Sequence, residues 1–177
     1  MIFSKANGAM MYRFLPDYMT KSIFHADLSK LYEKGVRGIA VDIDNTLVPM
    51  NTREPGSEAV QWIEKVKQAG FRVCILSNAR RHRTRLFMEK LGIHGIGLAG
   101  KPGKRGYLKV AEHMELPPEK CAILGDQLFT DIKGGVKAGF VTVLTHILDP
   151  DEIMFVRFKR HFERRLLKKY AGDIERI

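Results

Sequence analysis

The 177-residue sequence has little cysteine and no long apolar run. Its two cysteines, Cys74 and Cys121, each lie inside an apolar, strand-like stretch, which is typical of buried structural thiols and not of a disulfide or metal-binding pair. No apolar run approaches the roughly 18 residues that cross a bilayer, and the N-terminus lacks the apolar segment of a signal peptide. We therefore expect a cytoplasmic protein, with peripheral attachment to the inner face of the membrane left open.

Acidic residues are also scarce. The chain has 30 Lys and Arg against 20 Asp and Glu, which gives a formal net charge of +10. Such an excess favours an anionic partner, which can be a phosphorylated substrate, nucleic acid or an anionic membrane surface. The charge alone does not choose among these partners.

Apolar, strand-like runs alternate with helix-like segments through the middle of the chain. The expected strands are residues 39–41, 71–76, 96–99, 121–124 and 140–144, and the expected helices between them are 55–70, 80–91, 104–114 and 130–138. This alternation predicts an α/β fold in three Rossmann-like layers, with a mainly parallel sheet covered on both faces. We expect three parts: an N-terminal extension packed on the core (1–37), the core (38–150) and a basic C-terminal helix (151–177).

Polar side chains follow four of these strands at the point where each is expected to end. Asp42 and Asp44 lie two residues apart on an extended chain, so both side chains can face one small volume. Two carboxylates about 4 Å apart repel each other by roughly 4 kcal/mol at an effective dielectric constant of 20, so a cation or a shared proton must offset them. Because ligands of parallel sheets bind beyond the carboxyl ends of the strands, we expect these residues to gather there with Ser77, Asn78, Lys101 and Asp126.

These residue types suit phosphoryl transfer. Magnesium prefers a few carboxylate oxygens, waters and phosphate oxygens, so Asp42 and Asp126 are natural ligands, with the main-chain carbonyl of Asp44 as a third. Lys101 and the Ser77 hydroxyl would bind the phosphoryl oxygens. Aspartate is a known nucleophile toward phosphorus, so Asp42 would form an aspartyl-phosphate. Asp44 would protonate the leaving oxygen and then deprotonate the water that hydrolyses this intermediate.

The same residues resemble the four motifs of haloacid dehalogenase-like (HAD) phosphatases. The matching stretches occur in the family's order and are Asp42-Ile-Asp44-Asn45-Thr46-Leu47-Val48, Ser77-Asn78, Lys101 and Gly125-Asp126-Gln-Leu-Phe-Thr-Asp131. The resemblance implies Asp42 as nucleophile and Asp44 as acid/base, with Mg²⁺ as cofactor. It also implies a phosphate-binding set of Ser77, Asn78 and Lys101, and a metal-binding or metal-supporting set of Asp42, Asp44, Asp126 and Asp131.

The motif spacing leaves no room for the large cap domain that many HAD enzymes insert, because one helix and one strand fill each interval. An open site favours a bulky substrate such as a protein, a nucleic-acid end or a lipid headgroup, or a partner subunit that acts as a lid. Further stretches resemble the YqeG-like subgroup of HAD subfamily IIIA, namely Leu15-Pro16-Asp17, Ser22-Ile23, Gly35-Val36-Arg37-Gly38, Trp62, Arg157-Phe158 and Arg164-Arg165. That subgroup is related to mitochondrial phosphatidylglycerophosphate phosphatases, so the resemblance makes an anionic phospholipid headgroup a candidate substrate.

Two basic segments remain open to more than one interpretation. The cluster Arg80 to Arg85 is either a solvated helix face or a clamp for a headgroup or nucleic acid, with Arg80 and Arg81 as candidate substrate-binding residues. The expected helix over 151–170 is basic and amphipathic, and it can dock on its own domain or lie on an anionic membrane. These segments support an alternative function as a basic adaptor that binds RNA, ribosomes or membrane on an HAD scaffold.

Overall fold

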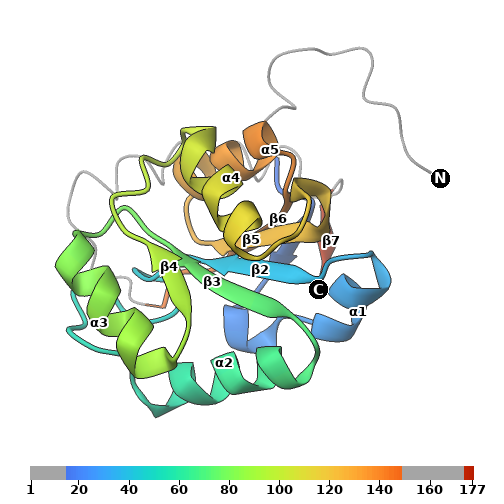
Figure 1. Ribbon diagram of the computed structural model, residues 1–177. Coiled ribbons are helices and arrows are strands. Elements are labelled where there is room, and N and C mark those ends of the chain that lie inside the picture. The colour runs from blue at the N-terminus through green and yellow to red at the C-terminus, as the bar shows by residue number, and fades with distance from the viewer. Residues whose placement is uncertain (1–14, 149–173) are drawn as a thin grey trace.

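The computed structural model describes residues 15–148 and 174–177, and the statements that follow concern those residues. They form one sheet of seven strands between two layers of helices (Figure 1). Neighbouring strands run parallel, in the order β4-β3-β2-β5-β6-β1-β7. This arrangement confirms the predicted three-layer α/β fold.

The elements follow the alternation that the sequence predicts. The strands are β1 (Tyr18–Thr20), β2 (Gly38–Val41), β3 (Arg72–Leu76), β4 (His94–Ile96), β5 (Cys121–Gly125), β6 (Val141–Thr145) and β7 (Glu175–Arg176). The α-helices are α1 (Leu28–Glu33), α2 (Ser57–Gln68), α3 (Arg81–Leu91), α4 (Lys104–His113) and α5 (Lys133–Ala138). Short 3₁₀ turns are η2 (Ile23–His25) and η3 (Pro118–Lys120), and η4 (Leu128–Ile132) is one turn of π-helix.

The central strand β2 is buried along its whole length. Ile39 and Val41 pack with the apolar side chains of α2 and α3, whereas Ala40 packs with those of α4 on the opposite face. Successive side chains of a strand point to opposite faces, so helices on both faces are needed to bury all of them. This explains why the strand reads as an uninterrupted apolar run.

Both cysteines are free and buried in the cluster on the α4 face, which confirms the expected structural thiols. Burial raises the pKa of Cys74 to about 11 and that of Cys121 to about 12. Neither thiol therefore has the low pKa of a reactive cysteine. None of the described helices combines the length and hydropathy needed to cross a bilayer.

The structure differs from the sequence expectation at three strands. The third expected strand, 96–99, instead forms at His94–Ile96. The backbone of Leu98 has φ +50°, and its N–H bonds to the carbonyl of Ala79, so the chain has already left the strand geometry there. Strands β1 and β7 were not predicted, and β1 comes from the expected N-terminal extension. The expected C-terminal helix over 151–170 lies outside the described residues, whereas Glu175–Arg176, in the expected basic C-terminal part (151–177), form β7.

The register of the sheet places the four strand ends at one edge. Val41 of β2 lies opposite Ile75 of β3 and Leu124 of β5, so the residues that follow these positions leave the sheet together. The interval from β2 to β3 contains α2, and the interval from β3 to β4 contains α3. Neither interval holds a cap domain, as the spacing predicted.

Candidate active site

The loop after β2 turns sharply and separates the two motif aspartates. Asn45 adopts the left-handed conformation (φ 57°), which asparagine tolerates better than most residues. Its N–H donates to the Val48 carbonyl at 2.8 Å, and the Val48 N–H donates to the Ile43 carbonyl at 3.1 Å. As a result Asp42 stays buried at the end of the sheet, whereas the side chain of Asp44 is 25% exposed.

A buried lysine joins two of the carboxylates. The Lys101 ammonium lies 2.8 Å from Asp42 Oδ1 and 2.6 Å from Asp131 Oδ1. Burial opposes the charge of Lys101, but the carboxylates of Asp131 and Asp42 outweigh it and raise its pKa above the ordinary value. Burial raises the pKa of Asp131 to about 6, although the Lys101 ammonium acts in the opposite direction. Lys101 is therefore a fixed cation within the site.

Hydrogen bonds to the main chain hold Lys101 and its partner Asp131 in place. The Lys101 N–H donates to Asn78 Oδ1 at 2.9 Å, and Asn78 Nδ2 donates to the Lys101 carbonyl at 3.1 Å. The Tyr107 hydroxyl contacts the carbonyls of Thr130 and Asp131 at 3.1 and 3.0 Å, which fixes the π-helical turn that presents Asp131. The main chain around Lys101 and Asp131 is thus anchored independently of their ion pair.

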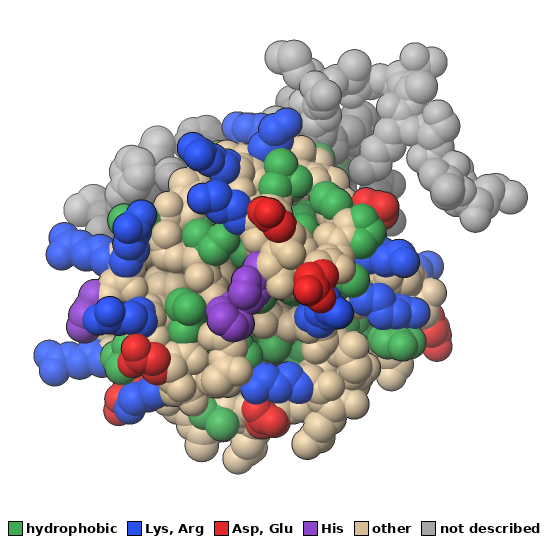
Figure 2. All heavy atoms as spheres, in the orientation of Figure 1, with side chains coloured by type: hydrophobic (Ala, Val, Ile, Leu, Met, Phe, Trp, Pro, Cys, Tyr) green, Lys and Arg blue, Asp and Glu red, His purple; other side chains and the backbone are tan. Residues whose placement is uncertain are grey.

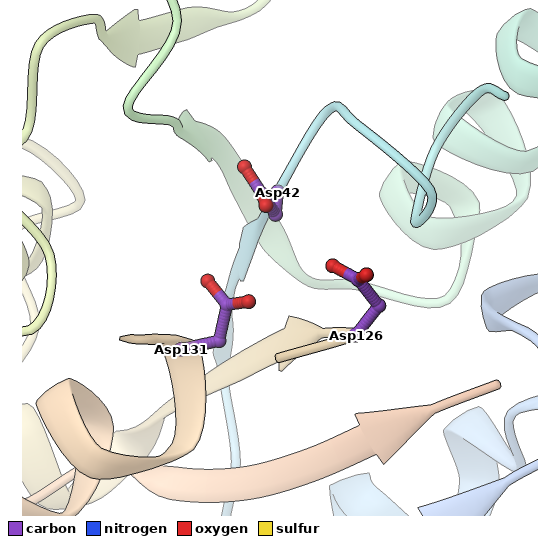
Figure 3. Close-up of side chains that lie close together, drawn as sticks. All are labelled: Asp42, Asp126 and Asp131. Atoms are coloured by element: carbon purple, nitrogen blue, oxygen red, sulfur yellow. The ribbon is translucent and has the colours of Figure 1, made fainter. Parts of the chain in front are cut away.

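Three carboxylates converge on one small volume (Figure 3). Asp42 from the end of β2, Asp126 after β5 and Asp131 from η4 point toward one another, with one oxygen of each within 4.8 Å of the others. All three are buried. Asp42 Oδ1 contacts Lys101 but has no partner with hydrogen-bond geometry among the described residues.

This donor set fits a hard divalent cation. The three carboxylates carry three negative charges when ionised, and Lys101 balances one of them, so two remain for a divalent cation. Hard cations such as Mg²⁺ prefer such oxygen ligands. Thr46 Oγ1 also donates to Asp126 Oδ1 at 3.3 Å, which orients this carboxylate. The Asp44 carboxylate lies outside the converging group, so among the described residues Asp42, Asp126 and Asp131 are the side chains that could hold the metal.

Arg83 holds the Asp44 carboxylate on the other side of the loop. Its Nη1 atom lies 2.7 Å from both Oδ1 and Oδ2 of Asp44. Its Nη2 and Nε atoms donate to the Thr52 carbonyl at 2.8 and 3.3 Å. The guanidinium therefore ties the first turn of α3 to the loop after β2.

A basic groove of about 550 Å³ lies beside the edge strand β4, between α3 and α4. Within the part of the chain that the structure describes, its charged or titratable lining residues are Arg81, His82, Arg85 and Lys109, and no acidic side chain lines it. Figure 2 views this edge of the sheet and shows Lys and Arg side chains gathered over α3. The groove adjoins the Ser77 segment, because the Ser77 N–H donates to the carbonyl of Ile96 in β4 at 3.0 Å.

Residues 7–139 match the family model described as haloacid dehalogenase-like hydrolase. The chain belongs to this family. The resemblance seen in the motifs is thereby confirmed, and the protein is an enzyme of the HAD hydrolase type.

Two curated relatives of this HAD hydrolase are named as phosphatases. The chain is 40% identical over 164 residues to the probable phosphatase YqeG of Bacillus subtilis (strain 168), covering 92% of this chain and 95% of that protein. It is 28% identical over 166 residues to phosphatidylglycerophosphate phosphatase 1, chloroplastic/mitochondrial, of Arabidopsis thaliana, covering 88% of this chain and 48% of that protein. The chain thus spans about half the length of the plant relative.

Solved structures of other proteins share the fold. The cobalt-bound deoxy-D-mannose-octulosonate 8-phosphate phosphatase of Haemophilus influenzae superposes with a TM-score of 0.53 at 15% identity, covering 78% of this chain and 90% of that one. A protein of Listeria monocytogenes serotype 4b superposes equally well, at 21% identity, over 67% of this chain and 85% of that one. At these identities the likeness supports the fold alone.

The structure separates the predicted site residues of the HAD hydrolase into groups. Ser77 is buried beside the cluster, and its Oγ accepts a hydrogen bond from the Ala79 N–H at 3.1 Å. The side-chain amide of Asn78 forms two hydrogen bonds with the main chain of Lys101. Arg80 is the N-cap residue of α3, and Arg81 lines the basic groove. No sequence pattern distinguished Arg83 from the other arginines of the basic cluster Arg80 to Arg85.

Proposed function

We propose that the protein is a Mg²⁺-dependent phosphomonoester hydrolase that works through an aspartyl-phosphate on Asp42. The observation that carries the proposal is the buried cluster in which three carboxylates and the Lys101 ammonium converge at the ends of the strands. Such a cluster supplies negative ligands for a cation and a positive charge for phosphoryl oxygens. The phosphatase relatives in the HAD family give independent support.

The roles of the side chains follow from their positions. Asp42 would attack phosphorus while the bond to the leaving oxygen breaks, and Asp44 would give that oxygen its proton. Asp44 would then take a proton from the water that attacks the aspartyl-phosphate, which releases phosphate and restores Asp42. Lys101 and the Ser77 hydroxyl would hold phosphoryl oxygens. Bound Mg²⁺ would neutralise phosphate charge and would be held by Asp42, Asp126 and Asp131.

For the substrate, we propose a phosphorylated anionic lipid headgroup, with phosphatidylglycerophosphate as the first compound to test. The plant relative bears that activity in its name. The intervals that often carry a cap hold only α2 and α3, so the described residues leave access to a bulky substrate. Cations also lie close to the Ser77 segment, at the groove that Arg81 lines.

A phosphate-release screen tests both parts of the proposal. Purified protein would be assayed with lipid, nucleotide and sugar phosphates, each with Mg²⁺ and with EDTA, beside the matched variant Asp42→Asn. We expect Mg²⁺-dependent release from phosphatidylglycerophosphate by the wild type and none by the variant. Activity on another phosphomonoester would refute only the lipid assignment, whereas no activity on the whole panel would refute the phosphatase.

The basic groove favours a second candidate function, the binding of an anionic chain such as RNA. A concave site lined by Arg81, Arg85 and Lys109 fits a strand of phosphates better than it fits a flat bilayer. Replacing Arg81 and Arg85 by glutamine should weaken binding of an RNA oligonucleotide and reduce its salt dependence. The matched control replaces Lys65 and Lys137, which are exposed on other helices, and an equal loss there would show that only net charge matters.

A further inference from the structure

Arg83 is built into the structure more firmly than the other arginines at the start of α3. Its three guanidinium nitrogens are all used, one on the two Asp44 oxygens and the others on the Thr52 carbonyl. The guanidinium also lies 5.3 Å from the centre of the Phe87 ring, one turn further along the same helix. By contrast, Arg85 has a side chain that is 70% exposed, and its ion-pair partner Glu89 lies on the same helix.

Asp44 depends on this contact for its orientation. Among the described residues, Arg83 is the partner that the structure gives to the Asp44 carboxylate. Both carboxylate oxygens lie 2.7 Å from Nη1, and Nη2 and Nε hold the guanidinium on the Thr52 carbonyl, so the position of the Asp44 carboxylate is fixed relative to the loop. Without Arg83, a side chain that is 25% exposed would be free to rotate into solvent.

We propose that Arg83 is a positioning residue that acts on the reaction through Asp44. This inference rests on the proposed function, because it presupposes Asp44 as the acid and base of an aspartyl-phosphate mechanism. Among the described residues, the side-chain contacts of Arg83 are with Asp44, Thr52 and Phe87, and none of them is with the converging carboxylates. Loss of Arg83 should therefore impair the proton transfers while leaving the attack by Asp42 intact.

The two proton transfers give this role a distinctive kinetic signature. An alkyl phosphate has a strongly basic leaving oxygen that must be protonated as its bond to phosphorus breaks. The leaving group of 2,4-dinitrophenyl phosphate departs as a stable phenolate and needs no proton. Hydrolysis of the aspartyl-phosphate requires a base for the attacking water whichever ester formed it. A misplaced Asp44 should thus slow the first step only for alkyl esters and the second step for both.

The experiment compares Arg83→Gln and Arg83→Lys with the wild type and with Lys90→Gln, the matched control on the same helix, which removes an exposed ion pair with Glu54 of the loop after β2. We expect Arg83→Gln to lower kcat/KM about 100-fold for an alkyl phosphomonoester, the low end of what acid–base catalysis contributes, and less than about threefold for 2,4-dinitrophenyl phosphate. With the aryl ester, Arg83→Gln should also release a burst of dinitrophenolate equal to the enzyme concentration before slow turnover. Arg83→Lys keeps the charge but loses the contacts with the Thr52 carbonyl that hold the guanidinium in place, so it should show a weaker form of the same pattern.

Each of the other possible outcomes of this experiment contradicts the proposal. Equal losses of kcat/KM for the two esters would overturn the proposal, because substrate binding or folding would then explain the effect. Unchanged kinetics in Arg83→Gln, or the same burst in Lys90→Gln, would overturn it as well. A wild type without activity on any phosphomonoester would refute the phosphatase and this role together, whereas an active wild type with uniform losses would refute the role alone. Circular dichroism and thermal unfolding of each variant separate misfolding from a kinetic effect.

Discussion

Two ion-pair clusters flank the loop after β2, and they differ chiefly in burial. In the first, the side chains of Lys101, Asp42 and Asp131 are 2%, 6% and 0% exposed. In the second, the side chains of Arg83 and Asp44 are 23% and 25% exposed. The distances are similar, at 2.6–2.8 Å in the buried cluster and 2.7 Å in the other, so geometry alone does not distinguish them.

The difference in burial suits the two clusters to different chemical roles. Removing one partner from a buried pair leaves an uncompensated charge in a medium of low dielectric constant, which costs about 3–5 kcal/mol. A solvent-exposed pair contributes about 0–1 kcal/mol, because water solvates the charges once the pair is broken. The buried cluster can therefore hold fixed charges against a phosphoryl group, whereas the Asp44 carboxylate can exchange protons with leaving groups and water.

The largest expected effect comes from removing the proposed nucleophile in the buried cluster. Asp42→Asn keeps the size of the side chain but cannot form an aspartyl-phosphate, so turnover should fall at least about 1000-fold. Phosphate release under saturating Mg²⁺ measures this loss. The fold should persist, since the substitution leaves Lys101 paired with Asp131, and retained turnover in Asp42→Asn would disprove the assignment of the nucleophile.

The second effect tests the buried cation as a structural element. Lys101→Met should lower the free energy of unfolding of the metal-free protein by about 3–5 kcal/mol, because Asp42 and Asp131 then face each other without a compensating charge. Urea unfolding measures it. The matched control is Lys90→Met, which breaks an ion pair with Glu54 in which both side chains are about half exposed, 45% and 56%. Similar losses in the two variants would contradict the comparison of buried and exposed pairs.

The third effect uses the metal to counter the buried negative charge. If Mg²⁺ binds the converging carboxylates, a concentration 100 times its dissociation constant should stabilise the protein by about 2.7 kcal/mol. Asp126→Asn should abolish most of this gain, whereas Glu112→Gln, an exposed acidic residue of α4, should leave it unchanged. The shift of the thermal midpoint with Mg²⁺ measures the effect, and an equal shift in all three proteins would point to binding elsewhere.

Part of the buried cluster was predictable from the sequence, because two of its carboxylates directly follow an apolar strand. Asp42 follows β2 and Asp126 follows β5, so a parallel sheet brings them to one edge whatever the loops do. Lys101 is separated from β4 by a short loop, and only its place in the motif order distinguished it from a surface lysine. The local sequence pattern was therefore sufficient to predict the location of those residues that the sheet itself positions.

The contacts that no local pattern encodes were missed. The pairing of Asp44 with Arg83 depends on where α3 begins relative to the loop after β2, which is a tertiary property. Strand β1 has only three residues and is defined by its parallel pairing with the distant strands β6 and β7. A run that short has no readable periodicity, so only the completed sheet identifies it as a strand.

The smallest expected effect concerns the stability that the partly buried pair of Arg83 and Asp44 contributes. Arg83→Gln should lower the free energy of unfolding by only about 1 kcal/mol, because water can replace Arg83 around Asp44 once the ion pair is lost. Urea unfolding beside Lys101→Met gives the direct comparison. A loss from Arg83→Gln as large as that from Lys101→Met would mean that the contact with Thr52 fixes the loop after β2, and that Arg83 is part of the framework. A small loss of stability joined to the leaving-group effect would instead place the function of Arg83 in the proton transfers, since residues kept for stability alone do not discriminate between esters.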